Sequence, residues 1–339
     1  MSWKDEFVKL FMSNDINDFS RALELKRTNV PRKLYRFRSI KTDEKLAQII
    51  DEIVLGQLYM AHPNELNDPF EMSSPLISKN SADYFGQGSF RGSKFDEAVI
   101  QCFGEDKARE LQSCGDWYNQ LMLLFAEEFK KGHGHSETEF VSIMEKIVMK
   151  QVEDLNKSYN SIFALSRIAS FTENCRSLPM WNHYADAYSG VCFEFAASDI
   201  EREILYINKL FPIIYVNKLP DAVQNGFAEL HNPNSKPPFG IKDYVAFHKL
   251  VDWSYEQEWR LIFNIGDFYY SLKEVPREYY STGRIVNFAR PSKIILGYHI
   301  CEVAESKIRK AAEMFSIPVV KMIITQYGFE EQIAMSTHM

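Results

Sequence analysis

The sequence predicts an α+β fold, with a mixed, mainly antiparallel sheet core, flanking helices and a helical insertion. Three observations predict it. Short alternating or β-branched apolar runs occur in the first 60 residues and return after residue 160. Between them lies a long stretch with helical periodicity. Aromatic residues make up 14% of the chain, which favours strands and aromatic-lined clefts.

The domain organisation follows from where the strand pattern stops and resumes. A chain of 339 residues is long enough for about two domains or one elaborated domain. We expect N-terminal helices over 1–30 and a single α+β domain over 31–330. A helical insertion at about 92–160 interrupts this domain, because the strand signals stop before it and return after it.

The first 71 residues predict alternating helices and strands. We expect two short helices over 3–26 with a break at 13–15, a strand over 34–38, a helix from Thr42 or Asp43 to Gly56, and a strand over 58–60. The segment 62–71 is rich in turn residues and predicts a loop.

The insertion predicts two main helices. One runs from about Trp117 to Phe129, and a second carries an apolar stripe between Phe140 and Leu155. The sequence Gly-His-Gly-His at 132–135 separates them, and no third metal ligand is nearby in the sequence. No metal site is therefore expected there.

The second half of the chain is rich in strands. We expect strands over 162–172, 190–195, 211–216, 253–264 and 294–297, a loop over 221–238, a helix over 302–315 and a closing strand over 317–324.

Composition excludes several classes of protein. The net charge of −7 argues against broad nucleic-acid binding. The five cysteines form no C-x-x-C motif, which is typical of reduced thiols. No apolar run approaches about 18 residues, and the N-terminus lacks the features of a signal peptide. We therefore expect a cytoplasmic protein without a membrane partner.

The stretch W-S-Y-E-Q-E-W-R-L-I-F at 253–263 is the strongest candidate for a functional element. As a strand it would place Glu256, Glu258 and Arg260 on one face and Trp259 on the other, with the two carboxylates roughly 7 Å apart. At that separation each carboxylate raises the pKa of the other, and the guanidinium opposes this. A plain charged ladder on a solvent-facing strand remains the alternative.

A second candidate region, 170–194, combines hydroxyl, aromatic and imidazole side chains. Pro179 suits the first turn of a helix that would align Trp181, Tyr184 and Tyr188 and end at Gly190. Such a stripe is more often core than ligand site, whereas His183 lies off the stripe and is the better polar candidate.

Two shorter motifs near the N-terminus carry charged residues. Asn67 and Asp68 in N-D-P-F-E fit an Asx turn, so a structural role is favoured for them. Arg36 and Arg38 share one face of the first strand. Arginine is rarely buried without an anion, either a carboxylate such as Glu258 or a phosphate.

The ordered motifs L-Y-R-F-R, N-D-P-F-E, M-W-N-H-Y-A, Y-E-Q-E-W-R and P-S-K-I-I-L-G together resemble a large bacterial family known only as a domain of unknown function. The resemblance runs from about Leu34 to Ile324, and the helical insertion is its least typical part. It implies an association with phage defence, because members are similar to genes of defence islands and mobile elements.

A second resemblance is to ADP-ribosyltransferases of the Arg-Ser-Glu type. Arg36 or Arg38, then the segment Ser170-Phe171-Thr172, then Glu256-Gln257-Glu258 occur in that family's order. The long insertion, Phe171 between the two hydroxyls and the lack of a Gly-rich phosphate loop depart from the family pattern.

This resemblance implies NAD as the cofactor and assigns roles to the residues. Glu258 would stabilise the oxocarbenium-like charge that forms when the nicotinamide bond breaks, and Glu256, Arg260 and His183 would assist. Arg36 or Arg38 would hold the diphosphate, Ser170 and Thr172 would contact the cofactor, and Trp181 or Tyr184 would stack on nicotinamide.

Two other functional classes stay open. A metal-dependent nuclease could use Asp68, Glu71, His183 and Glu258. A noncatalytic ligand-sensing or interaction module could bind a nucleotide-like small molecule and use the helical insertion to recognise a macromolecular partner. Complete consumption of Glu256, Glu258 and Arg260 by internal ion pairs would favour the sensing module.

Overall fold

The fold is described from a computed structural model of the chain. The structure describes residues 2–13, 15–68, 163–201, 208–219, 246–268, 281–326 and 328–333. Within the insertion it describes residues 99–101, 103–113, 117–133, 142, 146, 150, 153 and 157.

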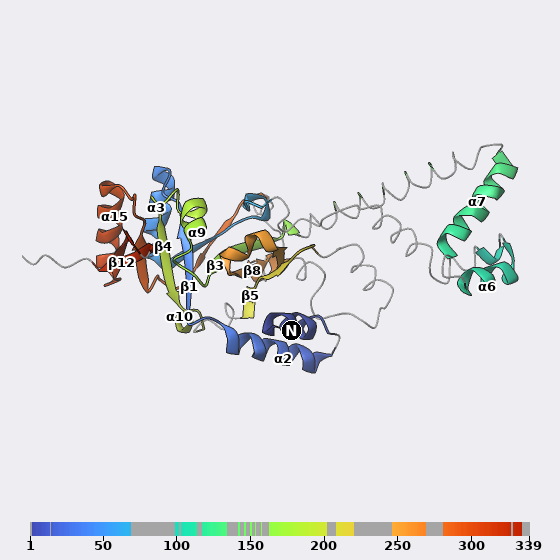
Figure 1. The fold of residues 1–339 in the computed structure, drawn as a ribbon, viewed down its shortest axis with the longest axis horizontal. Helices are drawn as coiled ribbons and strands as arrows, with labels where there is room; N and C mark the ends of the chain where they lie inside the picture. Colours follow the sequence, from blue (N-terminus) through green and yellow to red (C-terminus); the bar gives the residue numbers. More distant parts are fainter. Residues whose placement is uncertain are drawn as a thin grey trace, which may run out of the picture.

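An eight-stranded sheet forms the centre of the molecule, with strand order β12-β11-β10-β4-β1-β3-β8-β5 (Figure 1). Its strands are β1 (Lys33–Arg38), β3 (Ser166–Thr172), β4 (Val191–Ala196), β5 (Leu210–Pro212), β8 (Glu258–Asn264), β10 (Lys293–Leu296), β11 (Val319–Thr325) and β12 (Gly328–Ile333). Strands β10 and β11 pair in parallel, and the other neighbours pair antiparallel. The expected α+β fold with a mixed, mainly antiparallel sheet is confirmed.

Further helices and two small sheets complete the described structure. The helices are α1 (Trp3–Phe11), α2 (Ile16–Asn29), α3 (Asp43–Asp51), the π-helix η1 (Glu52–Gly56), the 3-10 helix η2 (Pro63–Glu65), α6 (Glu105–Ser113), α7 (Trp117–His133), α9 (Leu178–Tyr184), α10 (Ala197–Glu201), the 3-10 helix η3 (Val251–Glu256), α14 (Ile265–Phe268) and α15 (Glu302–Glu313). The small sheets pair β2 (Gln57–Met60) with β9 (Arg284–Asn287), and β6 (Ile214–Val216) with β7 (His248–Leu250).

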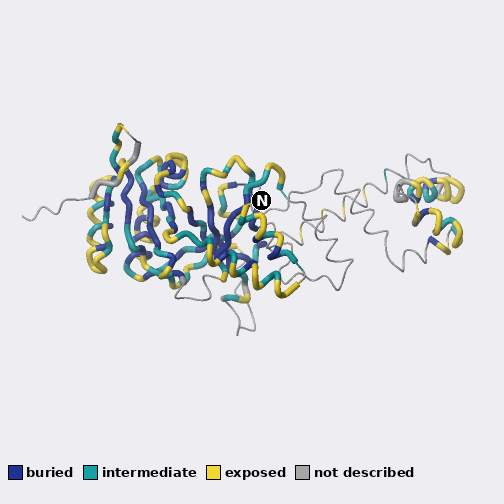
Figure 2. Tube along the Cα trace, turned by 60° about the horizontal axis from the view of Figure 1, so that its bottom comes forward, coloured by how far each residue is buried: buried dark blue, intermediate teal, exposed yellow. Residues whose placement is uncertain are grey.

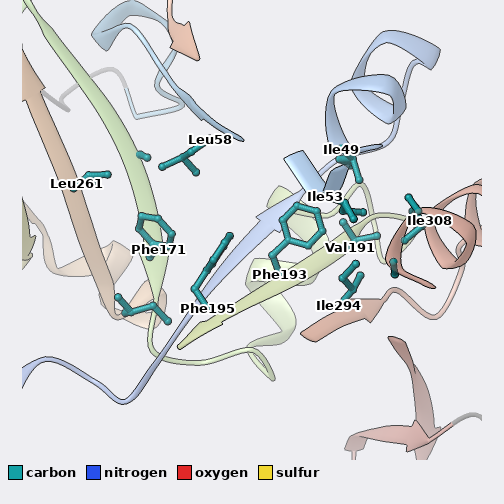
Figure 3. Close-up of a cluster of buried hydrophobic side chains, with 14 of the residues drawn as sticks. Ile49, Ile53, Leu58, Phe171, Val191, Phe193, Phe195, Leu261, Ile294 and Ile308 are labelled. Carbon is teal, nitrogen blue, oxygen red and sulfur yellow. The ribbon is translucent and has the colours of Figure 1, made fainter. Parts of the chain in front are cut away.

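One face of the sheet carries the largest apolar core, which continues across both halves of the sheet. Phe171, Phe193, Phe195 and Leu261 project from neighbouring strands into it (Figure 3). Helices α3 and α15 cover its far end, where Ile49 and Ile308 are fully buried. Alternating apolar residues in each strand produce this face.

The opposite face is divided between two smaller cores. Helices α1 and α2 pack Phe7, Phe11 and Ala22 against Ile262 of β8. Helix α9 packs Trp181 against the β1 and β4 region. In Figure 2 the strands of the sheet are mainly dark blue, whereas the surrounding helices carry exposed residues in yellow.

The pairing between neighbouring strands is shortest between β1 and β3. These strands pair at the single position Tyr35–Thr172, whereas β1 pairs with β4 over six positions from Lys33 to Arg38. Where β1 separates from β3, the end of β2 takes its place: Ala61 and Ile168 exchange both backbone hydrogen bonds, at 2.7 and 3.0 Å. A gap therefore opens within the sheet.

Several expected elements are confirmed with small shifts of their ends. The two N-terminal helices are α1, which ends at Phe11, and α2, which begins at Ile16. Thr42 caps α3 by accepting a hydrogen bond from the Lys45 backbone N–H. The helical path ends at Gly56, whose φ of 63° suits glycine, although its last turn is the π-helix η1.

Other expectations are corrected. The segment 253–264 is not one strand, because η3 runs to Glu256 and Gln257 turns the chain with a φ of 45° before β8 begins at Glu258. The segment 211–216 belongs to two strands in different sheets, β5 and β6. The helix expected to reach Gly190 ends at Tyr184, because residues 186–188 adopt positive φ.

The insertion is described in part. Helices α6 and α7 pack on each other through a small apolar cluster of their own that includes Ala108, Leu111 and Leu121 (Figure 1). The helix expected over 140–155 and the 132–135 loop lie largely outside the described residues. The expected loop over 221–238 lies wholly outside them. Strand β12 was not expected from the sequence.

Candidate functional site

A cleft of about 780 Å³ lies at the gap between β1 and β3. Elements β1, α3, β2, β3, α9, β7, η3 and β8 contribute to its lining. The sequence-predicted residues that line it are Arg36, Arg38, Ser170, Thr172, His183, Tyr184, Glu256 and Glu258. Two predicted residues, Trp181 and Arg260, are fully buried and are not among the lining residues.

One side of the cleft is a carboxylate wall, defined here as the lining residues Lys249, Glu256 and Glu258 together with the fully buried Arg260 that pairs with Glu258. Lys249 comes from β7, Glu256 ends η3, and Glu258 and Arg260 share one face of β8 because they are two residues apart. The turn at Gln257 brings Glu256 to the same side as Glu258. The three elements thus place two acids and two bases side by side.

Hydrogen bonds fix every member of the carboxylate wall. Lys249 Nζ lies 2.6 Å from Glu256 Oε2 and 3.3 Å from Glu258 Oε2. Arg260 donates from Nε and Nη2 to the two oxygens of Glu258, at 2.7 and 2.9 Å, and from Nη1 to the Ala246 carbonyl. The Tyr184 hydroxyl donates to Glu256 Oε1 at 2.6 Å. Such bidentate, charge-assisted contacts hold side chains in a single orientation.

Burial controls the protonation of this wall. Burial raises the pKa of Glu258, and the negative charge of Glu256 also raises it. The positive charge of Lys249 and a hydrogen bond with Ser170 lower this pKa. Burial alone would lower the pKa of Lys249, but the Glu258 and Glu256 carboxylates outweigh it and raise that pKa. Burial lowers the pKa of Arg260 to about 9, so Arg260 stays charged at neutral pH.

The other side of the cleft is an arginine wall, defined here as the lining residues Arg36 and Arg38 together with the buried Glu52 that pairs with Arg38. Arg36 donates from Nη1 to the Ser170 carbonyl at 3.3 Å and from Nη2 to the Tyr59 carbonyl at 2.7 Å. Arg38 Nη2 lies 2.9 Å from Glu52 Oε1, which η1 positions. Burial lowers the pKa of Arg36 to about 10, with a smaller contribution from Arg38.

The two walls come from opposite faces of the sheet. Tyr35 is directly opposite Thr172, and Thr172 is opposite Glu258, so these three side chains share a face. Arg36, the next residue on β1, therefore points to the other face. Arg36 reaches the cleft because β1 and β3 have separated, and its guanidinium contacts carbonyls of the strands on the far side of the gap.

Aromatic rings form a rim beside the carboxylate wall. His183 Nδ1 lies 3.1 Å from the Tyr255 hydroxyl, and ring contacts continue from Tyr184 through His183 and Tyr255 to Trp253. Trp181 instead packs against Phe37 and donates to the Cys175 carbonyl, so it belongs to the core. The expected stacking role at the cleft surface is therefore available to Tyr184 but not to Trp181.

Several residues of the site were not found by sequence reasoning. Lys249 lies in the run Phe247-His248-Lys249-Leu250, and the strand β7 was not recognised in it. Tyr215 accepts a hydrogen bond from the Glu258 backbone N–H at 2.8 Å. Lys41 and Lys45 line the cleft at the start of α3. An isolated lysine among apolar residues is the signal that could have revealed Lys249.

The N-D-P-F-E motif contributes through Asp68. Asp68 is buried, and its charge counteracts the burial that lowers the pKa of Arg260, so Asp68 lies near the carboxylate wall. Asn67 lines the cleft. Glu71, a candidate metal ligand, lies outside the described residues. Within the described part of the chain, no three His, Cys, Asp or Glu residues come together in a way that could hold a metal.

None of the helices in the described segments has the length and apolar character needed to cross a bilayer.

Comparisons with known proteins give one match. Neither the curated proteins nor the solved structures gave a match. The expected resemblance to a family of unknown function is confirmed over residues 180–261, which match the family model described as "Protein of unknown function (DUF2971)". This range holds most of α9, all of β4 and the whole carboxylate wall.

Proposed function

We propose that the protein is an ADP-ribosyltransferase-like protein that binds NAD in this cleft. The observation that carries the proposal is the convergence of Arg36, Arg38, Ser170 and Glu258, from three strands that are far apart in sequence, on a single cleft. A volume of about 780 Å³ suits a nucleotide-sized ligand.

The arginine wall supports the binding of an anionic group. Arg36 is buried, and its guanidinium donates to the carbonyls of Ser170 and Tyr59, which carry no full negative charge. Glu52 is shared between the two arginines, since it pairs with Arg38 and also favours the charged form of Arg36. Lys41 and Lys45 add positive charge at the mouth. A diphosphate would supply the missing negative charge.

The carboxylate wall supports cleavage of the nicotinamide glycosidic bond. When that C–N bond breaks, its electron pair leaves with nicotinamide and positive charge develops on the ribose. Glu258, held by Arg260, Lys249 and Ser170, would face this charge. Water or a nucleophile of a macromolecular target would then bond to the ribose carbon and lose a proton.

A noncatalytic ligand-sensing module is the second candidate. The specific observation in its favour is that the carboxylates of Glu256 and Glu258 are both engaged by internal donors. A carboxylate neutralised by Arg260 and Lys249 stabilises a developing cation less well than a free one. As a sensing module, the protein would bind the nucleotide in the cleft without cleaving it, and the rest of the chain would respond to the bound nucleotide.

A role in phage defence, as an effector or toxin, rests on the family resemblance alone. A partner protein or macromolecular target would contact the helical insertion, of which α6 and α7 are the described part. Their separate apolar cluster supports this proposal, because it gives the pair a packed core of its own.

Titration calorimetry with NAD tests the binding proposal, and release of nicotinamide tests the chemistry. We expect wild-type protein to bind NAD, and Glu258→Gln to bind it while losing at least about 100-fold of the nicotinamide release. Binding without release by the wild type would select the sensing module. Absence of NAD binding would refute the proposal for both candidates as stated.

Lysine variants provide the matched control. Lys45 and Lys310 are both exposed helical lysines, but Lys45 lines the cleft and Lys310 does not. We expect Lys45→Gln to weaken NAD binding about 3- to 10-fold through the loss of one cationic contact near a phosphate. Lys310→Gln should bind like the wild type, and equal effects would exclude contact of NAD with the α3 end of the cleft.

A further inference from the structure

We propose that Lys249 is a positioning residue that aims Glu256 and Glu258 at the cleft and favours the ionised form of Glu258 through a single ammonium group. Lys249 Nζ contacts Oε2 of both carboxylates, at 2.6 and 3.3 Å. The side chains of Lys249, Glu256 and Glu258 are each at most 4% exposed, so water contributes little to their solvation.

The geometry gives each carboxylate one oxygen for Lys249 and another for a different partner. Glu256 uses Oε1 for the Tyr184 hydroxyl. Glu258 uses Oε1 for Arg260 Nε and shares Oε2 between Arg260 Nη2 and Lys249. Lys249 is therefore the group that joins the two carboxylates, because Arg260 donates to Glu258 and Tyr184 donates to Glu256.

Lys249 supplies one of the two positive charges of the carboxylate wall, and Asp68, close to Arg260, adds a further negative charge beside the two carboxylates. Two carboxylates face one guanidinium and one ammonium, and without the ammonium the buried wall would carry a net negative charge. The other polar groups around it are Tyr184 of α9, Tyr215 of β6, Tyr255 of η3, Ser170 of β3 and the nearby Asp68. None of these supplies a positive charge that could replace Lys249.

The role of these carboxylates toward a ligand rests on the proposed function. If Glu258 faces a developing positive charge, it must be anionic, and the Lys249 ammonium favours that form. A purely structural role for Lys249 is the alternative, since its ammonium also lies 4.8 Å from the centre of the Trp253 ring. The two roles predict different results when the charge of Lys249 is removed: only the positioning role predicts a change in the ionisation of Glu258.

The test is a pH titration of the Glu258 carboxyl group by carbon NMR on the full chain labelled at glutamate, with Glu258→Gln used to assign the signal. Lys249→Gln should raise the pH at which Glu258 titrates by at least about one unit, because the main opposing charge is gone. Lys249→Arg should retain most of the wild-type value. The double variant Lys249→Gln with Glu256→Gln should move the titration back toward the wild type, because one charge of each sign has been removed.

Two results would overturn the inference. An unchanged Glu258 titration in folded Lys249→Gln would show that Lys249 does not control its ionisation. A double variant that titrates no closer to wild type than the single variant would show that packing, not charge, is responsible. If Lys249→Gln does not fold, the double variant is compared with Glu256→Gln, which keeps Lys249, and a Glu258 titration at the same pH in both would overturn the inference.

Failure of this inference and failure of the proposed function are distinguishable. The NMR titration needs no NAD, so a shifted Glu258 without NAD binding would refute only the NAD proposal. An unshifted Glu258 in a protein that releases nicotinamide from NAD would refute only the role of Lys249.

Discussion

The two walls of the cleft differ in how their buried charges are paired. In the carboxylate wall, two acids and two bases neutralise one another within hydrogen-bond distance. In the arginine wall, two guanidiniums share one carboxylate, and Arg36 is held by backbone carbonyls. The first arrangement fixes side chains, whereas the second leaves positive charge facing the cleft. The wall with the poorer internal pairing is therefore the one that we propose binds an anion.

The largest expected effect comes from breaking the carboxylate wall at Arg260. Arg260→Met should lower the free energy of unfolding by about 3 to 5 kcal/mol, because it leaves Glu258 buried without its bidentate partner. Urea unfolding measures this. The control is Arg309→Met, which removes a partly exposed pair with Glu305 on α15 and should cost about 1 kcal/mol or less. Equal losses would mean that the carboxylate wall is no more tightly coupled than a surface pair.

Breaking the arginine wall should cost less stability. Arg36→Met removes hydrogen bonds to the Ser170 and Tyr59 carbonyls but leaves no carboxylate without its direct ion-pair partner. We expect a loss of about 2 to 3 kcal/mol in urea unfolding, together with loss of NAD binding. Arg36→Lys should keep part of the charge and lose the geometry of two separate donors. A loss as large as that of Arg260→Met would remove the distinction between the walls.

A smaller, pH-dependent effect is expected at Lys26, a buried lysine of α2. Lys26 Nζ donates to the Asn208 carbonyl and lies 4.4 Å from the centre of the Phe211 ring. Burial, with a smaller contribution from Arg27, lowers its pKa to about 7. Lys249, buried between carboxylates, has its pKa raised instead. The two lysines separate the effect of burial from that of ion pairing.

The sign of the Lys26 effect follows from proton binding. Between pH 7 and pH 9 the unfolded chain still binds the Lys26 proton and the folded chain has lost it, so stability should rise with pH. Relative to Lys26→Met, the wild type should gain roughly 2 kcal/mol over this range in urea unfolding at each pH. No gain relative to Lys26→Met would show that Lys26 stays protonated when buried.

Local patterns predicted much of the fold because they depend on near neighbours in sequence. The cap at Thr42, the stop at Gly56 and the alternation in β8 all come from steric or hydrogen-bonding preferences that act over a few residues. The η3 turn was missed because W-S-Y-E alternates like a strand, and the positive φ of Gln257 leaves no mark in the sequence.

The candidate site was predicted as a set of residues but not as a geometry. Arg36, Ser170 and Glu258 line one cleft, yet Arg36 comes from the opposite face of the sheet to Glu258. The separation of β1 from β3 that permits this depends on β2 pairing at Ala61, a contact between distant segments. Lys249 and Glu52 were not predicted as site residues, because their partners lie in other elements that are distant in the sequence or separated by a turn.

The single paired position between β1 and β3 has a consequence for cooperativity. The five strands from β12 to β1 and the three from β3 to β5 meet at Tyr35 and Thr172, and their shared apolar core, rather than a hydrogen-bonded ladder, joins them. Side-chain packing yields more readily to local opening than a continuous ladder does. Amide hydrogens of β3 should therefore exchange earlier than those of β4, and a ligand spanning the gap would slow that exchange by linking the two halves.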